Sequence, residues 1–124
     1  MRAGDDAFAL PLKRRREERR SLQPLRALLP QAAGSGDEEY LRAFTERVEP
    51  AVRAFEPELV LVSAGFDAHV DDPLAGMRVT RDGFRELARR SAALAPRVAA
   101  VLEGGYDPRT LPSLVEAARE GFTE

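Results

Sequence analysis

The segment LVLVSAGFDAH, residues 59–69, joins a strand-like run to a group of polar side chains. Its first five residues, Leu59 to Ser63, carry no charge, which is typical of a strand covered on both faces of a parallel sheet. Asp67 follows shortly after, and His69, the only histidine of the chain, lies two residues further on. Since a carboxylate beside a buried strand needs hydrogen-bond donors, a cation or water, this boundary is the first candidate for a functional site.

A helix is predicted before this strand. After the breaking sequence GSG at residues 34–36, apolar side chains recur at intervals of three and four and build one face. Ser35 or Asp37 is expected to cap the helix, and Pro50 predicts a kink or a restart inside it. The apolar face consists of Tyr40, Leu41, Phe44, Val48, Val52 and Phe55.

Beyond the first strand, the sequence predicts a helix, a second strand and a last helix. Thr80 is a candidate N-cap for the first of these helices, which should stop before Pro96. The run RVAAVL, residues 97–102, predicts the second buried strand. Asp107 and Pro108 predict the start of the last helix, with the aspartate as N-cap and the proline at the first helical position.

The order helix, strand, helix, strand, helix predicts an α/β fold with parallel strands and a right-handed crossover. Ligands of open α/β sheets bind beyond the carboxyl ends of the strands. Two segments follow such ends here, GFDAH at 65–69 and EGGYD at 103–107. If the strands are neighbours, both segments lie at the same edge of the sheet, roughly 5–10 Å apart.

Spacing alone leaves two interpretations for the polar residues after the first strand. Asp67 is either a turn-forming residue whose oxygens accept backbone N–H groups or a ligand for a cation. With His69 it forms an Asp-x-His pair that could present two ligands to a divalent metal, although a histidine in a surface loop is the simpler interpretation. Asp71 adds another carboxylate, and Asp72, which precedes Pro73, is expected to organise a turn.

The segment after the second strand is equally open. Gly104 and Gly105 allow either a tight turn or a close approach of the backbone to a ligand. Tyr106 would then lie at the rim with a hydroxyl that can donate a hydrogen bond; alternatively, its ring packs on the core of a structural turn. Glu103 is expected to be solvated or paired with a neighbour.

Composition excludes several kinds of site. The 124 residues include no cysteine and one histidine, so a cysteine nucleophile, a disulfide and any site of two or three histidines are excluded within the chain. The net charge of −2 does not indicate nucleic-acid or membrane binding, and a soluble cytoplasmic protein is expected. Residues 1–33 predict a basic, poorly ordered lead-in, with a basic arm for an acidic partner as the alternative.

The two strand-end segments, taken together, resemble a known family. The motifs PELVLVSAGFDAHVDDPLAGMRVTRDGF (57–84) and VLEGGYD (101–107) are similar to the C-terminal part of the histone deacetylase superfamily, which includes acetoin-utilisation proteins and acetylpolyamine amidohydrolases. The resemblance covers residues 34–124 and implies the C-terminal portion of an arginase/deacetylase-like parallel sheet flanked by helices. Residues 1 to about 30 show no such resemblance.

The resemblance implies a role for each residue that matches a family motif. Asp67 matches one of three protein ligands of a catalytic zinc ion, Zn²⁺. Tyr106 matches the catalytic tyrosine that, together with the zinc, polarises the amide carbonyl and stabilises the oxyanion. Gly104 and Gly105 match the substrate-binding glycines beside the acetyl group. His69 matches no ligand, which argues against the metal pair with Asp67.

The family also takes an aspartate ligand, a histidine ligand and a pair of histidines from upstream motifs, and a chain with one histidine does not contain that set. The zinc site is therefore expected to be incomplete, and the chain is predicted to be a truncated deacetylase that is inactive alone. The implied reaction is hydrolysis of N-acetyl amides, on acetyl-lysine or an acetylpolyamine.

Two other functions are open. The chain could be a non-catalytic α/β interaction module or a pseudogene remnant, or it could be a different hydrolase that uses Asp67 and His69 as an acid/base pair. Val70 and Asp71 stand where relatives usually have a more basic residue and a glycine, so the fine shape of this loop is expected to differ from the family.

Overall fold

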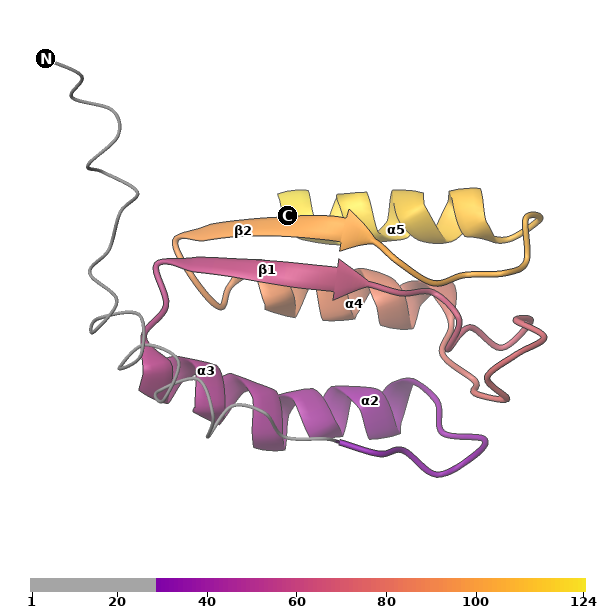
Figure 1. The fold of residues 1–124 in the computed structure, drawn as a ribbon, viewed down its shortest axis with the longest axis horizontal. Coiled ribbons are helices and arrows are strands. Elements are labelled where there is room, and N and C mark those ends of the chain that lie inside the picture. The colour runs from indigo at the N-terminus through magenta and orange to yellow at the C-terminus, as the bar shows by residue number, and fades with distance from the viewer. Residues whose placement is uncertain (1–28) are drawn as a thin grey trace, which may run out of the picture.

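The computed structural model describes residues 29–124, which form a two-stranded parallel sheet with helices packed beside it (Figure 1). The predicted α/β order and both predicted strands are confirmed. Residues 1–28 of the predicted lead-in lie outside the described residues. The elements are α2 (Asp37–Ala43), the π-helical η2 (Phe44–Val48), α3 (Glu49–Phe55), β1 (Leu59–Ala64), α4 (Arg81–Ala92), β2 (Arg97–Leu102) and α5 (Leu111–Thr123).

The two strands pair along their whole length, and the pairing continues past their ends. Beyond the last strand residues, the N–H of Glu103 donates to the carbonyl of Ala64 at 2.9 Å. The N–H of Phe66 then donates to the carbonyl of Gly104 at 2.8 Å. The two segments that follow the strands are therefore hydrogen-bonded neighbours at one edge of the sheet, as the sequence predicts.

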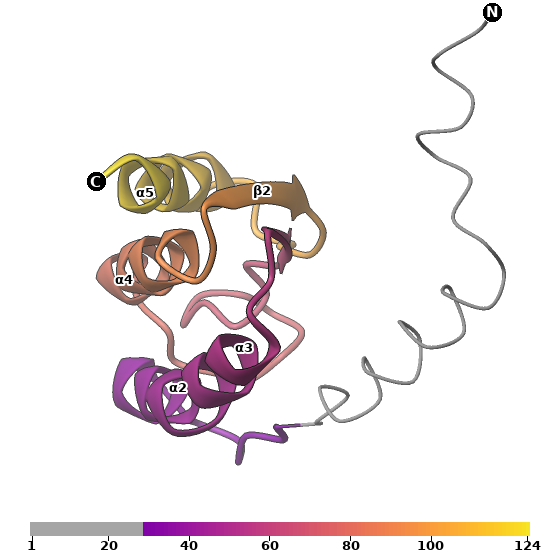
Figure 2. The same cartoon turned by 90° about the vertical axis from the view of Figure 1, so that its left-hand side faces the viewer.

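Within residues 29–124, helices cover one face of β1 and part of the same face of β2, and nothing covers the opposite face. Helices α4 and α5 lie on the same side of the strands (Figures 1 and 2). On the opposite face Leu61 is 71% exposed and Val101 is 60% exposed. The prediction of a strand buried on both faces is therefore wrong for β1, because no side chain of residues 29–124 covers its outer face. The prediction of a second buried strand is also wrong for β2, since none of its six residues is buried. The apolar pattern of β1 nevertheless suits a second covering layer.

The core lies between the sheet and helices α4 and α5. Phe66 packs on Phe84 with ring centroids 5.1 Å apart and the rings tilted by 58°. Because Phe66 is 4% exposed, it anchors the turn that carries Asp67. The buried cluster consists of Phe66, Val79, Phe84, Ala88, Leu114 and Ala118.

The first helical region restarts at Pro50, as predicted. Proline has no N–H to donate and disrupts a continuous helix. Here the chain widens into η2, where the N–H of Glu49 donates to the carbonyl of Phe44, five residues earlier. Pro50 then occupies the first turn of α3, where a missing N–H costs nothing.

The cap of α2 differs from the prediction of Ser35 or Asp37. Gly36 is the N-cap, and its N–H donates to Oε2 of Glu39 at 2.9 Å. Asp37 instead accepts from the backbone N–H of Thr80 at 2.7 Å and from its hydroxyl at 2.5 Å. Its carboxylate therefore ties the start of α2 to the start of α4, a long-range contact that local spacing does not reveal.

Helix α4 begins as predicted and α5 does not. Thr80 caps α4, since its hydroxyl accepts the N–H of Gly83 at 3.2 Å. Helix α5 begins at Leu111, with Thr110 as N-cap, and not at Asp107. The carboxylate of Asp107 accepts the N–H of Arg109 two residues later, which closes a separate turn before the helix.

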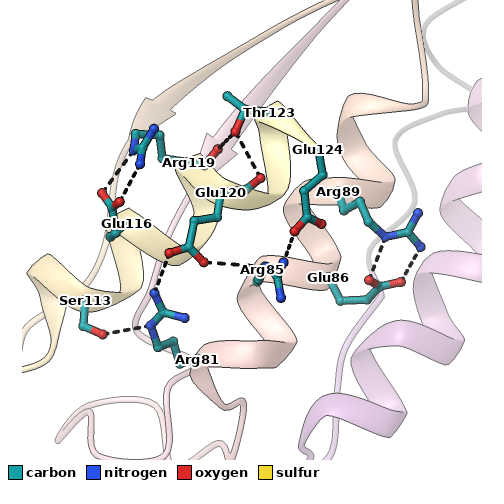
Figure 3. Close-up of polar contacts among 10 residues, drawn as sticks. All are labelled: Arg81, Arg85, Glu86, Arg89, Ser113, Glu116, Arg119, Glu120, Thr123 and Glu124. Atoms are coloured by element: carbon teal, nitrogen blue, oxygen red, sulfur yellow. Dashed lines mark hydrogen bonds and ion pairs between the residues drawn. The ribbon is translucent and has the colours of Figure 1, made fainter.

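Ion pairs join α4 to α5 on their outer surface (Figure 3). Arg81 donates to Glu120 at 3.1 Å, and Arg85 pairs with both Glu120 and Glu124. These side chains are between about a third and a half exposed, so each pair contributes about 1 kcal/mol or less. The apolar contacts beneath them therefore dominate the packing of the two helices.

No helix among residues 29–124 is long and apolar enough to cross a membrane.

Leu114→Ala is expected to lower the free energy of unfolding by about 2–4 kcal/mol, because it empties a buried site against α4. The side chain of Leu114 is 2% exposed, whereas that of the neighbouring Val115 is 41% exposed. Val115→Ala is thus the matched control. Urea unfolding followed by circular dichroism measures both, and equal losses for the two variants would contradict the described core.

Glu86 on α4 gives a pH-dependent contribution to stability. Its carboxylate accepts hydrogen bonds from Arg89 at 2.6 and 2.8 Å and from Arg90 at 2.8 Å. The hydrogen bonds from these two arginines lower the pKa of Glu86 to about 2. Since the folded-state pKa lies below the ordinary value of 4.5, the contribution is fully present above that value and is lost as the pH falls toward 2.

Glu86→Gln is accordingly expected to lower the melting temperature at pH 7 and to match the wild type near pH 2. Melting curves recorded between pH 7 and pH 2 test this, with Glu46→Gln, an exposed glutamate of η2, as the control. A gap between wild type and Glu86→Gln that stays constant down to pH 2 would show that the ion pairs do not act in this way.

Candidate active site

Asp67 lies in the turn after β1, directly against the segment that follows β2. A β-carbon on Gly104 would lie 3.1 Å from both Cγ and Oδ1 of Asp67, and a β-carbon on Gly65 would lie 3.1 Å from the same Oδ1. The carboxylate is therefore held between two backbone segments that approach closely because both positions are glycine. The two strand-end segments predicted to meet do meet at this carboxylate.

The backbone turns sharply at Gly105 before it reaches Tyr106. Gly105 has φ +134°, and a β-carbon there would lie 2.7 Å from Cδ1 of Leu111 and 3.2 Å from Cβ of Phe66. The side chain of Tyr106 follows this turn and is 55% exposed. Its ring therefore does not pack on the core, and the interpretation of a purely structural turn is wrong on this point. The side chain of Tyr106 is therefore largely exposed beside this turn.

The carboxylate of Asp72 joins its own loop to the segment that follows β2. Its Oδ1 accepts the N–H of Leu74 at 3.0 Å. This bond spans Pro73 and closes the turn that the sequence predicts. Oδ2 of Asp72 accepts the N–H of Tyr106 at 2.8 Å, from a position 34 residues further along the chain. The side chain of Asp72 is 8% exposed. Spacing reveals the turn, but the second contact depends on the fold and is absent from the sequence pattern.

Tyr40 of α2 is half-buried and close enough to Asp67 to sense its charge. Burial raises the pKa of its phenol, and the negative charge of Asp67 raises it further. The hydroxyl therefore stays protonated near neutral pH and can act as a donor. The sequence pattern assigned Tyr40 only to the apolar face of a helix, and it does pack against the core cluster.

His69 is buried within the loop that follows β1 and hydrogen-bonds to its backbone. Its side chain is 8% exposed, so the expected surface position is wrong. The ring Nδ1 accepts the N–H of Asp71 at 3.2 Å, and the ring centroid lies 6.4 Å from that of Phe84. Nδ1 is engaged within the loop, which agrees with the argument against an Asp67–His69 metal pair.

Asp107 closes the site on the side that leads to α5. Its carboxylate accepts hydrogen bonds from the side chain of Arg109 at 3.1 and 3.2 Å. The guanidinium and the N–H of Arg109 lower the pKa of this carboxyl below its usual range. A hollow of about 270 Å³ beside Tyr106 is lined by Asp71, Pro73, Tyr106, Asp107, Pro108 and Arg109.

A metal centre is not complete within the described part of the chain. Residues 29–124 contain no group of three or more histidine, aspartate or glutamate side chains placed to hold one ion. Asp67 can offer one carboxylate, whereas catalytic zinc takes three protein ligands. The residues present therefore do not fit a zinc ion on their own.

Comparison with known proteins identifies the family. The model of the histone deacetylase domain matches residues 8–122 and so begins inside the segment 1–33, for which no resemblance was expected. A probable deacetylase of Archaeoglobus fulgidus is 41% identical over 83 residues, which is 63% of this chain and 23% of that protein. A chloroplastic histone deacetylase 10 of Oryza sativa is 45% identical over 99 residues, covering 76% and 22%.

A solved structure agrees with the sequence relatives. The acetylpolyamine aminohydrolase of Burkholderia pseudomallei superposes with a TM-score of 0.68 at 33% identity, over 76% of this chain and 27% of that one. The chain thus spans about a quarter of the length of each of these three proteins. With the matched domain extending over residues 8–122, this chain belongs to the histone deacetylase family.

Proposed function

We propose that this chain supplies Asp67 and Tyr106 to a zinc-dependent deacetylase that hydrolyses N-acetyl amides. The observation that supports the proposal is the hydrogen-bonded junction of the two strand ends. There the carboxylate of Asp67 lies against Gly104, and Tyr106 follows two residues later with its phenol exposed. Family membership gives these residues their expected chemistry.

Tyr106 is the proposed catalytic donor. Hydrolysis of an amide places negative charge on the former carbonyl oxygen, and a fixed donor aimed at that oxygen stabilises the transition state more than the ground state. The phenol of Tyr106 is free to donate because it is half exposed, while its backbone is held by Asp72. Gly104 and Gly105 carry no side chain that would obstruct the acetyl group.

Asp67 is the proposed zinc ligand. Because residues 29–124 do not complete a zinc site, its partners are proposed to come from outside them. When bound, zinc supplies an activated water at neutral pH. The carboxylate of Asp67 is already confined between Gly65 and Gly104, so little conformational freedom remains to be lost on binding.

The bare face of the sheet supports the idea that further polypeptide completes the domain. Leu59 is 51% exposed and Leu61 is 71% exposed on β1, and Val101 on β2 is 60% exposed. Apolar patches of this kind mark contact surfaces. Since the chain spans about a quarter of its relatives, we propose that the rest of a deacetylase domain covers this face and that residues 34–124 correspond to the C-terminal portion of such a domain.

The proposed substrate is an acetylated amine, either acetyl-lysine or an acetylpolyamine of the class named for the Burkholderia pseudomallei enzyme. Neither a membrane nor a nucleic acid is a proposed partner, and the cytoplasm is the proposed location. A non-catalytic interaction module is the second candidate, and the bare sheet face is the observation that favours it.

The isolated chain is expected to show little or no deacetylase activity, whereas a chimera should be active. In the chimera, the matched 83-residue segment of the Archaeoglobus fulgidus protein is replaced by the corresponding residues of this chain. Tyr106→Phe in the chimera should lower kcat by at least about 100-fold, the usual effect of removing one oxyanion donor. Release of acetate from acetyl-lysine and acetylpolyamine reporters measures both.

Thr123→Val serves as the control, since this exposed residue at the end of α5 lies at the far end of the helix from the site. A chimera that folds, as judged by circular dichroism, but has no activity would favour the interaction module. Strong activity of the isolated chain that depends on Tyr106 would show that the domain is complete without further polypeptide.

Asp67→Asn is expected to reduce the zinc content of the purified chimera by at least about tenfold, because it removes a charged ligand. Metal analysis after dialysis measures this. His69→Ala should leave the zinc content close to that of the parent, since its ring is engaged in the loop. The reverse result, zinc retained in Asp67→Asn and activity lost in His69→Ala, would favour a hydrolase that uses His69 as an acid or base.

A further inference from the structure

Asp72 is a buried carboxylate with a long-range partner. Its two oxygens accept two backbone N–H groups, Oδ1 from Leu74 at 3.0 Å and Oδ2 from Tyr106 at 2.8 Å. With 8% of the side chain exposed, water competes little for these bonds. A carboxylate in this setting holds its donors more firmly than a neutral acceptor would.

The residues next to Asp72 determine the orientation of its carboxylate. Pro73 has a fixed φ and no N–H, so the next free backbone donor is Leu74, and the bond to it closes a short turn. That bond uses Oδ1 and leaves Oδ2 directed away from the turn, toward Tyr106. The carboxylate is therefore oriented by its own loop before it contacts the second segment.

Tyr106 needs such a contact because of the residues that precede it. Gly104 and Gly105 have wide conformational freedom, and Gly105 adopts φ +134°. On the other side, Asp107 is fixed in its turn with Arg109. The bond from the N–H of Tyr106 to Asp72 therefore fixes the backbone between two glycines of low intrinsic conformational preference and the turn at Asp107.

From this geometry we infer that Asp72 is a positioning residue for Tyr106. It fixes the Tyr106 backbone, and hence the direction in which the phenol projects over the rim. The inference rests on the proposed function for its catalytic meaning, since Tyr106 is the donor there. Asp72 itself does not reach the reacting atoms in this account, because both of its oxygens are occupied by backbone donors.

Asp72→Asn separates the two contacts. Asparagine has one acceptor oxygen, and its NH₂ group only donates. The oxygen should keep the short-range bond to Leu74, so the NH₂ group then faces the N–H of Tyr106, and that bond is lost. Amide hydrogen exchange of the full 124-residue chain, read by NMR, should show the Tyr106 N–H exchanging at least about tenfold faster, the factor expected for losing a bond to a charged acceptor. The backbone order parameter of Tyr106 should fall as well.

The controls distinguish positioning from general loop stability. Val70 donates its N–H to the carbonyl of Val79 in the same loop, and its exchange should stay unchanged in Asp72→Asn. Asp71→Asn removes an equal charge from the adjacent exposed position, and Tyr106 exchange should match the wild type there. Asp72→Ala should accelerate exchange at both Leu74 and Tyr106.

Unchanged exchange at Tyr106 in Asp72→Asn, or equal acceleration at Tyr106 and Val70, would overturn the inference. Neither readout depends on catalysis. The folded chimera could lack deacetylase activity while Asp72→Asn still accelerates exchange at the Tyr106 N–H alone. In that case the proposed function fails, and the conclusion that Asp72 fixes the Tyr106 backbone stands.

Discussion

The hydrogen bond from the Phe66 N–H to the Gly104 carbonyl continues the parallel ladder beyond the last residues of β1 and β2. Without it, the two strands would diverge where the candidate site begins. The buried ring of Phe66 secures one partner of this bond, and the absence of a side chain at Gly104 lets the other approach. The placement of Asp67 follows from that bond, since its carboxylate lies over the same glycine.

Much of the fold follows from local chemistry that is visible in the sequence. The two apolar runs predicted both strands with the correct type and pairing, and Thr80 caps α4 as its side chain predicts. Pro50 marked the helix restart because proline is disfavoured inside a helix and tolerated in its first turn. The meeting of the two strand-end segments followed from topology alone, and the family resemblance added the roles proposed for Asp67 and Tyr106.

The features that escaped the sequence are those that depend on distant partners. Asp37 bonds to Thr80 rather than capping its own helix, and Asp72 reaches Tyr106 across the sheet edge. The burial of His69 depends on how its loop folds back over Phe84. Short polar side chains satisfy backbone donors equally well nearby or far away, so spacing cannot decide between the two.

The exposed apolar face of the sheet affects the solubility of the purified chain. Leu61 and Val101 expose apolar side chains of the kind usually found in a protein core. Within residues 29–124, each strand also pairs along one edge and leaves its other edge open. Open strand edges and flat apolar faces template association with further chains. Without a covering segment, the chain is therefore prone to self-association through this face as its concentration rises. Solubilising substitutions on this face, away from the strand ends, would keep it monomeric for measurements that need a concentrated sample.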